Sequence, residues 1–352
     1  MSVGTGRIAR DIAFTLEKKS EKIFENIFLQ NGVLALMGVN SRVKVVQGGN
    51  RFDERVHLGQ NSTVDHRSKY TAIPTDLQDN FLTASYGQAT ISGASVVNMV
   101  EADQNMGKHR IDDLASALVE EAQLTFPNKI GSALMAASPD ATQPESIHQR
   151  IEATAQGSQT SSLGGISRAD HKGVADPTDM WQNYYSSSAI SDIGAAAGIA
   201  AFSKFLFKCS PGGTAKTEQP DIVLTTIGVF SKAHGGADAN RRYNATEKLT
   251  VFGFDNIKFN NAAMLADRNV PAGYAYALNT NYMRIQVLGG RSTKVVGDVK
   301  TVGDGKQSIA LQVRPPIESD NSLHYAIKMY MVYNLTFGGL RQHGLQVSIT
   351  EA

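Results

Sequence analysis

The sequence predicts an α+β fold on three observations. Apolar and polar residues alternate with a period of two from Arg42 to Val97, and again in the run Tyr325–Leu335. Apolar residues recur at helical spacing over Asn105–Ala136, and four short apolar strands separated by turns fill Leu249–Leu288. A period of two indicates strands and a period of 3.6 indicates helices, so both kinds of element contribute to the fold.

Length and composition restrict the class of protein. The 352 residues are enough for two or three lobes with at least one sizeable core. The formal net charge is only +1. Proteins that bind nucleic-acid phosphates usually carry an excess of Lys and Arg, so the charge does not favour a nucleic-acid-binding domain. Cys209 is the only cysteine, so an internal disulfide is excluded. No signal-peptide pattern or membrane-length apolar run of about 20 residues occurs, so we expect a cytoplasmic product.

An amphipathic helix is predicted over Asp11–Gln30. Ile12, Leu16, Ile23 and Ile27 fall on one face at helical spacing, while most charged residues lie off that face. Such an apolar face has to be buried, either in its own domain or against a neighbouring subunit.

The stretch from Arg42 to Val97 is predicted to form an extended antiparallel excursion of hairpin type. Its short alternating runs are separated by turn signals such as Gly48-Gly49-Asn50 and Pro74. It holds too few apolar side chains for a core of its own, and isolated hairpins are only marginally stable in water. The ribbon therefore has to pack on something else.

The longest predicted helix covers Asn105–Ala136. Ile111, Leu114 and Leu118 form its apolar stripe. Pro127 lies in its second half, where a proline removes one backbone hydrogen bond and clashes with a carbonyl, so a kink or a break is expected there.

A second structured lobe is predicted after a polar stretch. Ser138–Val174 is poor in apolar residues and rich in Ser, Gln, Gly and Thr, which predicts a long surface loop or a partly mobile segment. A buried strand at Asp221–Thr226 and a helix at Thr226–Lys232 follow, and another strand-like run covers Arg341–Ile349. Before them, a helical stripe is formed by Ile190, Ile193, Ala197, Ala201 and Phe205. This order predicts an α+β lobe around a small central sheet.

No catalytic, cofactor or metal site is predicted. The sequence lacks the G-x-S-x-G, H-E-x-x-H, C-x-x-C, P-loop and dinucleotide patterns, and its eight histidines are scattered. The pairs Asp112-Asp113 and Glu120-Glu121 are typical of the solvated face of a helix. Trp181, Tyr184 and Tyr185 have no basic residues beside them, as base stacking would require, so we expect them to pack in a core.

Two consecutive motifs lie within Leu249–Leu288. A turn of the form x-D-x-V-P-x-G is followed by a strand of the form Y-x-L-N-T-x-Y. Their residues are Asp267, Val270, Pro271, Gly273, Tyr276, Leu278, Asn279, Thr280 and Tyr282. This segment resembles the late axial-domain segment of tailed-phage major capsid proteins, which have the Hong Kong 97 fold. The order of elements resembles that family over most of the chain, and individual residues do so over Asp221–Leu288.

The resemblance implies five regions. They are an N-terminal arm with an amphipathic helix (1–41), an extended β-hairpin loop (42–104), a long spine helix of the peripheral domain (105–140), an axial domain (141–288) and return strands of the peripheral domain (289–352). In this family the loop reaches over the adjacent subunit. The candidate intersubunit contacts are Arg51, Asp53, Glu54, Arg55, Arg67, Lys69, Ile23 and Ile27. No isopeptide cross-link is predicted, because nothing identifies the asparagine and glutamate that it would need.

The function implied by the resemblance is that of a major capsid protein. Copies would form the hexamers and pentamers of an icosahedral procapsid that matures around the double-stranded DNA of a tailed phage. The implied partners are further copies, a separate scaffolding protein, a portal protein and a decoration protein, with only non-specific DNA contact and no membrane. We expect the protein in the virion, after assembly in the host cytoplasm. Two alternatives remain: an encapsulin-like nanocompartment shell and, more remotely, a soluble hydrolase or sugar-binding protein.

Overall fold

The computed structural model describes most of the chain beyond its N-terminal region. The described residues are 42–59, 61, 63–77, 80–98, 121, 125–169, 180–210, 217–240, 257–259, 262–289, 298–300, 306–308, 312–313, 317–319 and 322–351. The predicted N-terminal helix, with Ile23 and Ile27, and the first half of the predicted spine helix lie outside them.

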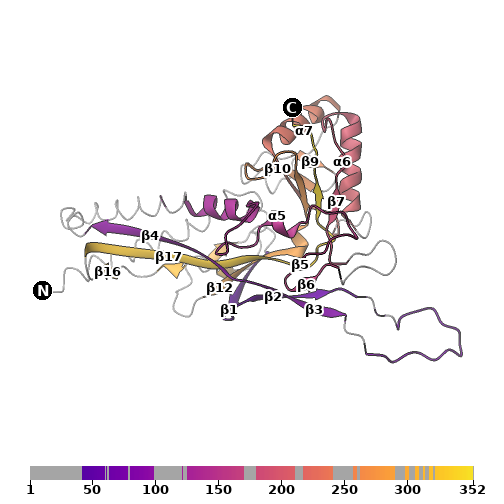
Figure 1. The fold of residues 1–352 in the computed structure, drawn as a ribbon, viewed down its shortest axis with the longest axis horizontal. Helices are drawn as coiled ribbons and strands as arrows, with labels where there is room; N and C mark the ends of the chain where they lie inside the picture. The colour runs from indigo at the N-terminus through magenta and orange to yellow at the C-terminus, as the bar shows by residue number, and fades with distance from the viewer. Residues whose placement is uncertain are drawn as a thin grey trace.

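The first of two six-stranded sheets is organised around one long strand, β17 (Ser322–Phe337). β17 pairs antiparallel with β4 (Ala89–Asn98) and β12 (Met283–Gly289), and β12 pairs parallel with β1 (Val43–Gln47). The short strands β15 (Gln312–Val313) and β16 (Ile317–Ser319) also pair with β17. In Figure 1, β4 and β17 run side by side to one end of the molecule.

The alternation of apolar side chains along β17 determines which face of this sheet packs against the rest of the subunit. Met329, Met331, Tyr333 and Leu335 are buried, in one core with Phe126, Ile130 and Leu134 of the helix over residues 125–135. Gly93 of β4 allows that helix to approach, because a Cβ at this position would lie 3.1 Å from Cε2 of Phe126. Residues 122–124 lie outside the described part, so the predicted break near Pro127 stays a prediction.

The second sheet has the order β7-β18-β11-β8-β10-β9 and belongs to the upper lobe of Figure 1. The bounds of its strands are β7 (Tyr184–Ser186), β8 (Ile222–Thr225), β9 (Ile257–Phe259), β10 (Ala262–Ala266), β11 (Ala275–Leu278) and β18 (Gly344–Gln346). Alternate residues of β8 face different cores: Ile222 and Leu224 join the core shared with the first sheet, and Val223 packs with residues of α6 (Ala196–Lys208) and α7 (Ile227–Asn240). The α+β prediction is confirmed, and so are the strands predicted within Leu249–Leu288 as far as the described residues from Ile257 onward reach.

Two sequence-based details of this lobe are wrong. Ala197 and Ala201 are exposed, and the buried face of α6 holds Gly198, Phe202, Phe205 and Leu206. The helix begins only at Ala196, so Ile190 and Ile193, which precede it, do not set the phase of its stripe. The second detail is the tail. The resemblance implied that all return strands of 289–352 join the peripheral sheet, and β17 does lie in the first sheet, but β18 pairs with β11 and β7 of the second sheet.

The chain passes between the two sheets within a few residues, at the L-N-T-x-Y motif. The 3₁₀ turn η1 (Thr280–Tyr282) joins β11 to β12. Nδ2 of Asn279 donates to the carbonyls of Thr217 and Gln219, both at 2.9 Å, and N of Thr280 donates to Oδ1 of Asp221 at 2.8 Å. The motif therefore fixes the crossing by fastening the turn to residues that lead into β8.

A buried histidine completes this junction. Nδ1 of His343 accepts the backbone N–H of Asn279 at 3.2 Å, and its ring meets Phe337 edge to face with centroids 5.0 Å apart. Burial lowers the pKa of His343 to about 3, although the Gly339 backbone acts in the opposite direction. The imidazole is thus held neutral, with Nδ1 free of a proton so that it can accept.

Three two-stranded ladders and one short helix complete the described elements. Their bounds are β2 (Phe52–His57) with β3 (Phe81–Tyr86), β5 (Ser162–Leu163) with β6 (Ile166–Ser167), β13 (Asp298–Lys300) with β14 (Lys306–Ser308), and α5 (Ile147–Arg150).

Two phenylalanines of α6 allow a matched test of how much the core between the second sheet and α6–α7 stabilises the subunit. Phe202 is fully buried and Phe207 is 43% exposed. Phe202→Ala should lower the free energy of unfolding by about 3–5 kcal/mol, because it leaves a cavity, whereas Phe207→Ala should change it by less than about 1 kcal/mol. Urea unfolding of the unassembled subunit measures both, and equal losses would contradict the packing described here.

Acid should destabilise the subunit through His343. In the unfolded chain the pKa of histidine is about 6.5, whereas in the folded chain it is about 3. The unfolded state therefore takes up the proton first, and stability falls as the pH drops below about 6.5. Between about pH 7 and pH 4.5, wild type should lose about 3 kcal/mol more than His343→Gln. Urea unfolding at both pH values measures this difference, and equal losses would exclude His343 as its source.

Candidate functional site

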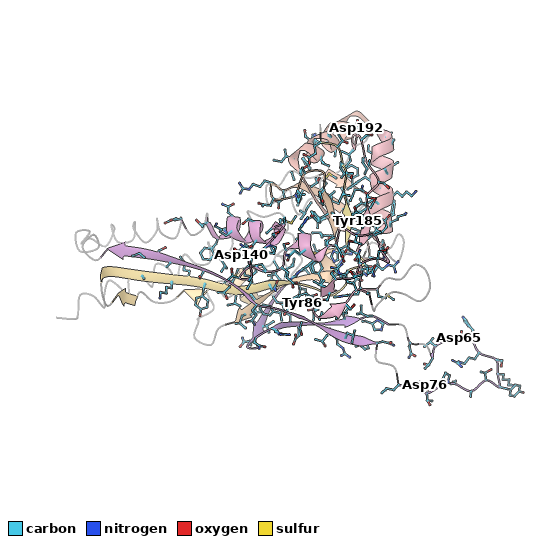
Figure 2. All side chains as sticks on the ribbon, viewed as in Figure 1. Asp65, Asp76, Tyr86, Asp140, Tyr185 and Asp192 are labelled. Atoms are coloured by element: carbon cyan, nitrogen blue, oxygen red, sulfur yellow. The ribbon has the colours of Figure 1, made fainter. Side chains whose placement is uncertain are left out.

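The most prominent surface feature is a hairpin that leaves the body of the molecule. β2 and β3 pair antiparallel in register from Phe52↔Tyr86 to His57↔Phe81. The loop 58–80 continues beyond them and extends far from both sheets (Figure 1). Figure 2 places Asp65 and Asp76 on this loop and Tyr86 at the base of the hairpin. The hairpin expected within residues 42–97 is therefore present, but β1 and β4 on either side of it belong to the first sheet.

The described part of the loop exposes four large apolar side chains. Val64 is 79% exposed, Tyr70 91%, Ile73 74% and Leu77 99%. Full burial of such a side chain stabilises by about 1.5–3 kcal/mol, whereas an exposed ion pair contributes only about 0–1 kcal/mol. Over 58–80, Arg67 and Lys69 are balanced by Asp65, Asp76 and Asp79, which leaves a net charge of −1 with histidine neutral. The loop is thus better suited to apolar contact than to charge pairing.

Hydrogen bonds within the loop hold its shape. The guanidinium of Arg67 donates to the carbonyls of Thr63 and Ala72, both at 3.2 Å, and the hydroxyls of Ser68 and Thr71 lie 2.7 Å apart. Arg67 therefore has a role inside its own subunit that the sequence did not indicate.

The two faces of the hairpin differ because side chains alternate along each strand. Phe52, Val56, Ala84 and Tyr86 are buried on the inner face. On the outer face, the guanidinium of Arg55 lies 4.3 Å from the ring centroid of Phe81. The same ring is 4.7 Å from that of His57.

Glu54 points inward, between Phe52 and Val56. Its Oε1 lies 2.8 Å from Nη1 of Arg284, and its Oε2 accepts from Nε2 of Gln286 at 3.0 Å. The sequence could have predicted this orientation. Phe52, Glu54 and Val56 occupy alternate positions of one strand, so their side chains point to the same face.

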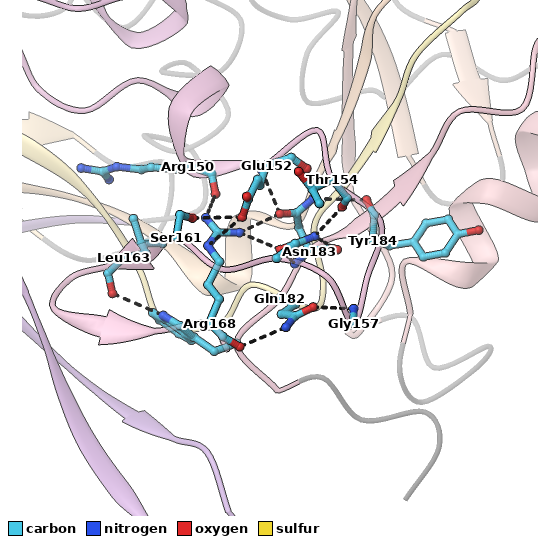
Figure 3. A network of polar contacts seen from close by, with 12 residues as sticks. Arg150, Glu152, Thr154, Gly157, Ser161, Leu163, Arg168, Gln182, Asn183 and Tyr184 are labelled. Atoms are coloured by element: carbon cyan, nitrogen blue, oxygen red, sulfur yellow. Dashed lines mark hydrogen bonds and ion pairs between the residues drawn. The ribbon is translucent and has the colours of Figure 1, made fainter. Parts of the chain in front are cut away.

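A buried polar network lies beside the hairpin, mostly in the segment predicted to be a surface loop or a partly mobile segment (Figure 3). Arg150 and Arg168 are each only 1% exposed. Nη1 of Arg168 donates to Oε1 of Gln159 and Oδ1 of Asn183, both at 2.9 Å, and its Nη2 donates to the carbonyl of Arg150. Ile147, Ile151, Leu163 and Ile166 are also buried. Residues 138–143 are largely exposed, as predicted, but the prediction is wrong for 144–169. There, hydrogen bonds among buried polar side chains take the place of the missing apolar contacts, although Nε and Nη1 of Arg150 and Nε of Arg168 have no hydrogen-bond partner among the described residues.

Arg150 connects this network to the hairpin. Its Nη2 donates to Oδ1 of Asn334 at 2.8 Å, and its guanidinium lies 4.9 Å from the ring centroid of Tyr86 and 5.6 Å from that of Phe337. Its Nε is 3.4 Å from Oε2 of Glu145, an ion pair rather than an aligned hydrogen bond. Burial lowers the pKa of Arg150, while Tyr86 and Glu145 oppose the shift.

The structure distributes the eight candidate contact residues among different roles. Arg51 is exposed, and Lys69 lies on the loop with its Nζ 5.9 Å from the ring centroid of Tyr70. Asp53 accepts from the hydroxyl of Ser85, while Glu54, Arg55 and Arg67 have the partners described above. Ile23 and Ile27 lie outside the described residues. Sequence reasoning missed Val64, Tyr70, Ile73 and Leu77, because whether an apolar side chain in a loop is covered depends on the tertiary structure.

Within the described residues nothing forms a metal or membrane site. No group of three His, Cys, Asp or Glu side chains is arranged to hold a metal ion, and no helix there is long and apolar enough to cross a membrane. Trp181 is fully buried, with its Nε1 donating to the carbonyl of Leu163 at 3.3 Å, which confirms that it packs in a core.

Comparison with solved structures identifies the fold. The chain is similar to a protein of the cyanophage A-1(L) capsid asymmetric unit, with a TM-score of 0.62 and 14% identity over 90% of this chain and 92% of the other. It is also similar to a chain of the satellite phage P4 procapsid that includes the size determination protein Sid, with a TM-score of 0.51, 10% identity, and 94% and 91% of the two chains covered. The chain has the Hong Kong 97-type capsid fold.

A third likeness agrees with this assignment. The capsid of an empty GTA particle gives a TM-score of 0.51 at 10% identity, over 89% of this chain and 90% of the other. No protein-family model matches the sequence, and no curated protein matches it. The Hong Kong 97-type fold is therefore recognised here by its three-dimensional arrangement, and the likeness extends over about nine-tenths of the chain.

Proposed function

We propose that this protein is a major capsid protein, whose copies assemble into the icosahedral shell around the double-stranded DNA of a tailed phage. The observation that carries the proposal is the match, over about 90% of both chains, to a protein of an assembled phage capsid. The projecting loop supports it independently, because four large apolar side chains are exposed on a segment that its own subunit does not cover. The role is structural rather than catalytic.

In this proposal, the loop of one copy packs against a neighbour in hexamers and pentamers. Burial of Val64, Tyr70, Ile73 and Leu77 supplies most of the attraction, and the loss of freedom on docking offsets part of it. Each contact stays modest, and multiplicity stabilises the closed shell. Arg51 and Lys69 remain candidates for intersubunit ion pairs, and Ile23 and Ile27 for apolar contacts. The predicted domain boundaries are part of this proposal, except that β18 is assigned to the lobe of the second sheet.

The partners follow from the same proposal. A separate scaffolding protein and a portal protein would guide assembly in the host cytoplasm, a decoration protein could bind the finished virion, and packaged DNA would touch the shell without sequence preference. A net charge of +1 supports weak DNA contact, since affinity for phosphate grows with each unpaired basic residue.

The assembly state tests the proposal. We expect the protein, expressed with its neighbouring genes, to form closed shells tens of nanometres across, visible by electron microscopy and sedimentation. Shells that contain a cargo enzyme and need no scaffold or portal would favour the encapsulin-like alternative. A small discrete oligomer under all conditions would contradict a shell role and favour the soluble hydrolase or sugar-binding alternative.

Substitutions in the loop 58–80 distinguish docking through apolar side chains from docking through ion pairs. Tyr70→Ser combined with Leu77→Ser should raise the concentration needed for assembly at least about tenfold, because two exposed apolar side chains are lost. The fold should be unaffected. The matched control, Asp76→Asn, changes only a charge in the same loop and should assemble like wild type. Light scattering against protein concentration measures both, and a larger effect of the control would contradict apolar docking.

A further inference from the structure

Glu54 occupies an unusual position for a charged residue. It lies on the inner face of β2, flanked by the buried Phe52 and Val56, and its side chain is only 11% exposed. Both carboxylate oxygens are engaged, Oε1 with Arg284 at 2.8 Å and Oε2 with Gln286 at 3.0 Å. Because the partners are two residues apart on β12, the attachment constrains the direction of the carboxylate as well as its distance.

The residues that receive Glu54 belong to the first sheet and are hydrogen-bonded within it, although the Arg284 side chain is 41% exposed. Gln286 is 1% exposed and Thr336 is fully buried. Nε2 of Gln286 also lies 3.2 Å from Oγ1 of Thr336, and that hydroxyl donates to the carbonyl of Arg284 at 3.2 Å. Arg284 and Gln286 both lie on β12, which is paired with β17 and therefore cannot shift without breaking the first sheet.

The other strand of the hairpin is fastened separately. The hydroxyl of Tyr86 donates to the carbonyl of Phe337 at 2.9 Å and accepts the backbone N–H of the same residue at 3.3 Å. N of Ser85 donates to the carbonyl of Gly164 at 2.9 Å. A Cβ at Gly164 would lie only 2.8 Å from Cβ of Ala84, so this turn lies directly against β3. Each strand of the hairpin thus has its own attachment to the body.

We propose that Glu54 is a positioning residue, which fixes the angle at which the hairpin and the loop 58–80 leave the subunit. The role rests on the proposed shell function, since the angle matters only where the loop meets another copy. It replaces the sequence-based interpretation of Glu54 as a direct intersubunit contact. A small rotation of β2 and β3 where they meet the body becomes a large displacement at the far end of the loop. A fixed angle therefore restricts the angle, and so the curvature, at which neighbouring copies can pack.

Two measurements on Glu54→Gln test this role, with Asp53→Asn as the matched control on the adjacent, outward-facing position. Hydrogen exchange of the amides in 52–57 and 81–86 on the unassembled subunit should accelerate at least about tenfold in Glu54→Gln and stay unchanged in the control. Electron microscopy should show folded Glu54→Gln subunits that still associate, but into particles of mixed diameter or into open sheets.

The outcomes separate this proposal from the proposed function. Wild-type protein that forms no shells would contradict the shell function, while hydrogen exchange would still decide whether Glu54 fixes the hairpin. Altered particles with unchanged exchange would make Glu54 a contact residue and overturn the positioning role, as would unchanged exchange and unchanged particles. If Glu54→Gln does not fold, Arg284→Met removes the partner of Oε1 of Glu54 from a half-exposed position and should accelerate the same amides. Unchanged exchange in that variant would overturn the proposal.

Discussion

Strand β17 is the element on which the rest of the structure depends. Its sixteen residues pair with β15 and β16, which directly precede it, and with β4 and β12, which come from more distant parts of the sequence. A buried strand has to pair its backbone groups on both sides, so these partners are obligatory rather than optional. Because β4 and β17 lie more than two hundred residues apart in sequence, the first sheet forms only when the whole chain has come together.

A small number of polar attachments gives this apolar framework its particular shape. Apolar packing tolerates small shifts, whereas a buried charge or amide is satisfied in few arrangements. Arg150 and Arg168 order a segment that is poor in apolar residues, and Asn279 and Thr280 fix the crossing between the sheets. Glu54 and Tyr86 attach the hairpin. These polar groups fix the orientation of the segments that they join, which apolar burial alone does not do.

The proposed shell function depends on a difference within the hairpin: its strands β2 and β3 are attached to the body, whereas the apolar side chains of the loop 58–80 are uncovered. The body supplies rigidity through two sheets and a continuous core. The loop supplies exposed apolar surface, which gains stability only when another surface covers it. Several of the charged residues first considered as contacts have partners within the subunit itself, so the proposal assigns most of the attraction between copies to Tyr70, Leu77 and their apolar neighbours.

The sequence alone determined the α+β class, the strands within 249–288, the long strand near the C-terminus and the hairpin, because period-two and helical patterns are local properties. It also located the L-N-T-x-Y motif, but not its contacts with Thr217 and Asp221, which depend on chain segments about sixty residues away. Only the tertiary structure decided that β18 joins the second sheet and that 144–169 is packed. Strand partners and buried polar networks are chosen by long-range contacts, and no local pattern of residues encodes them.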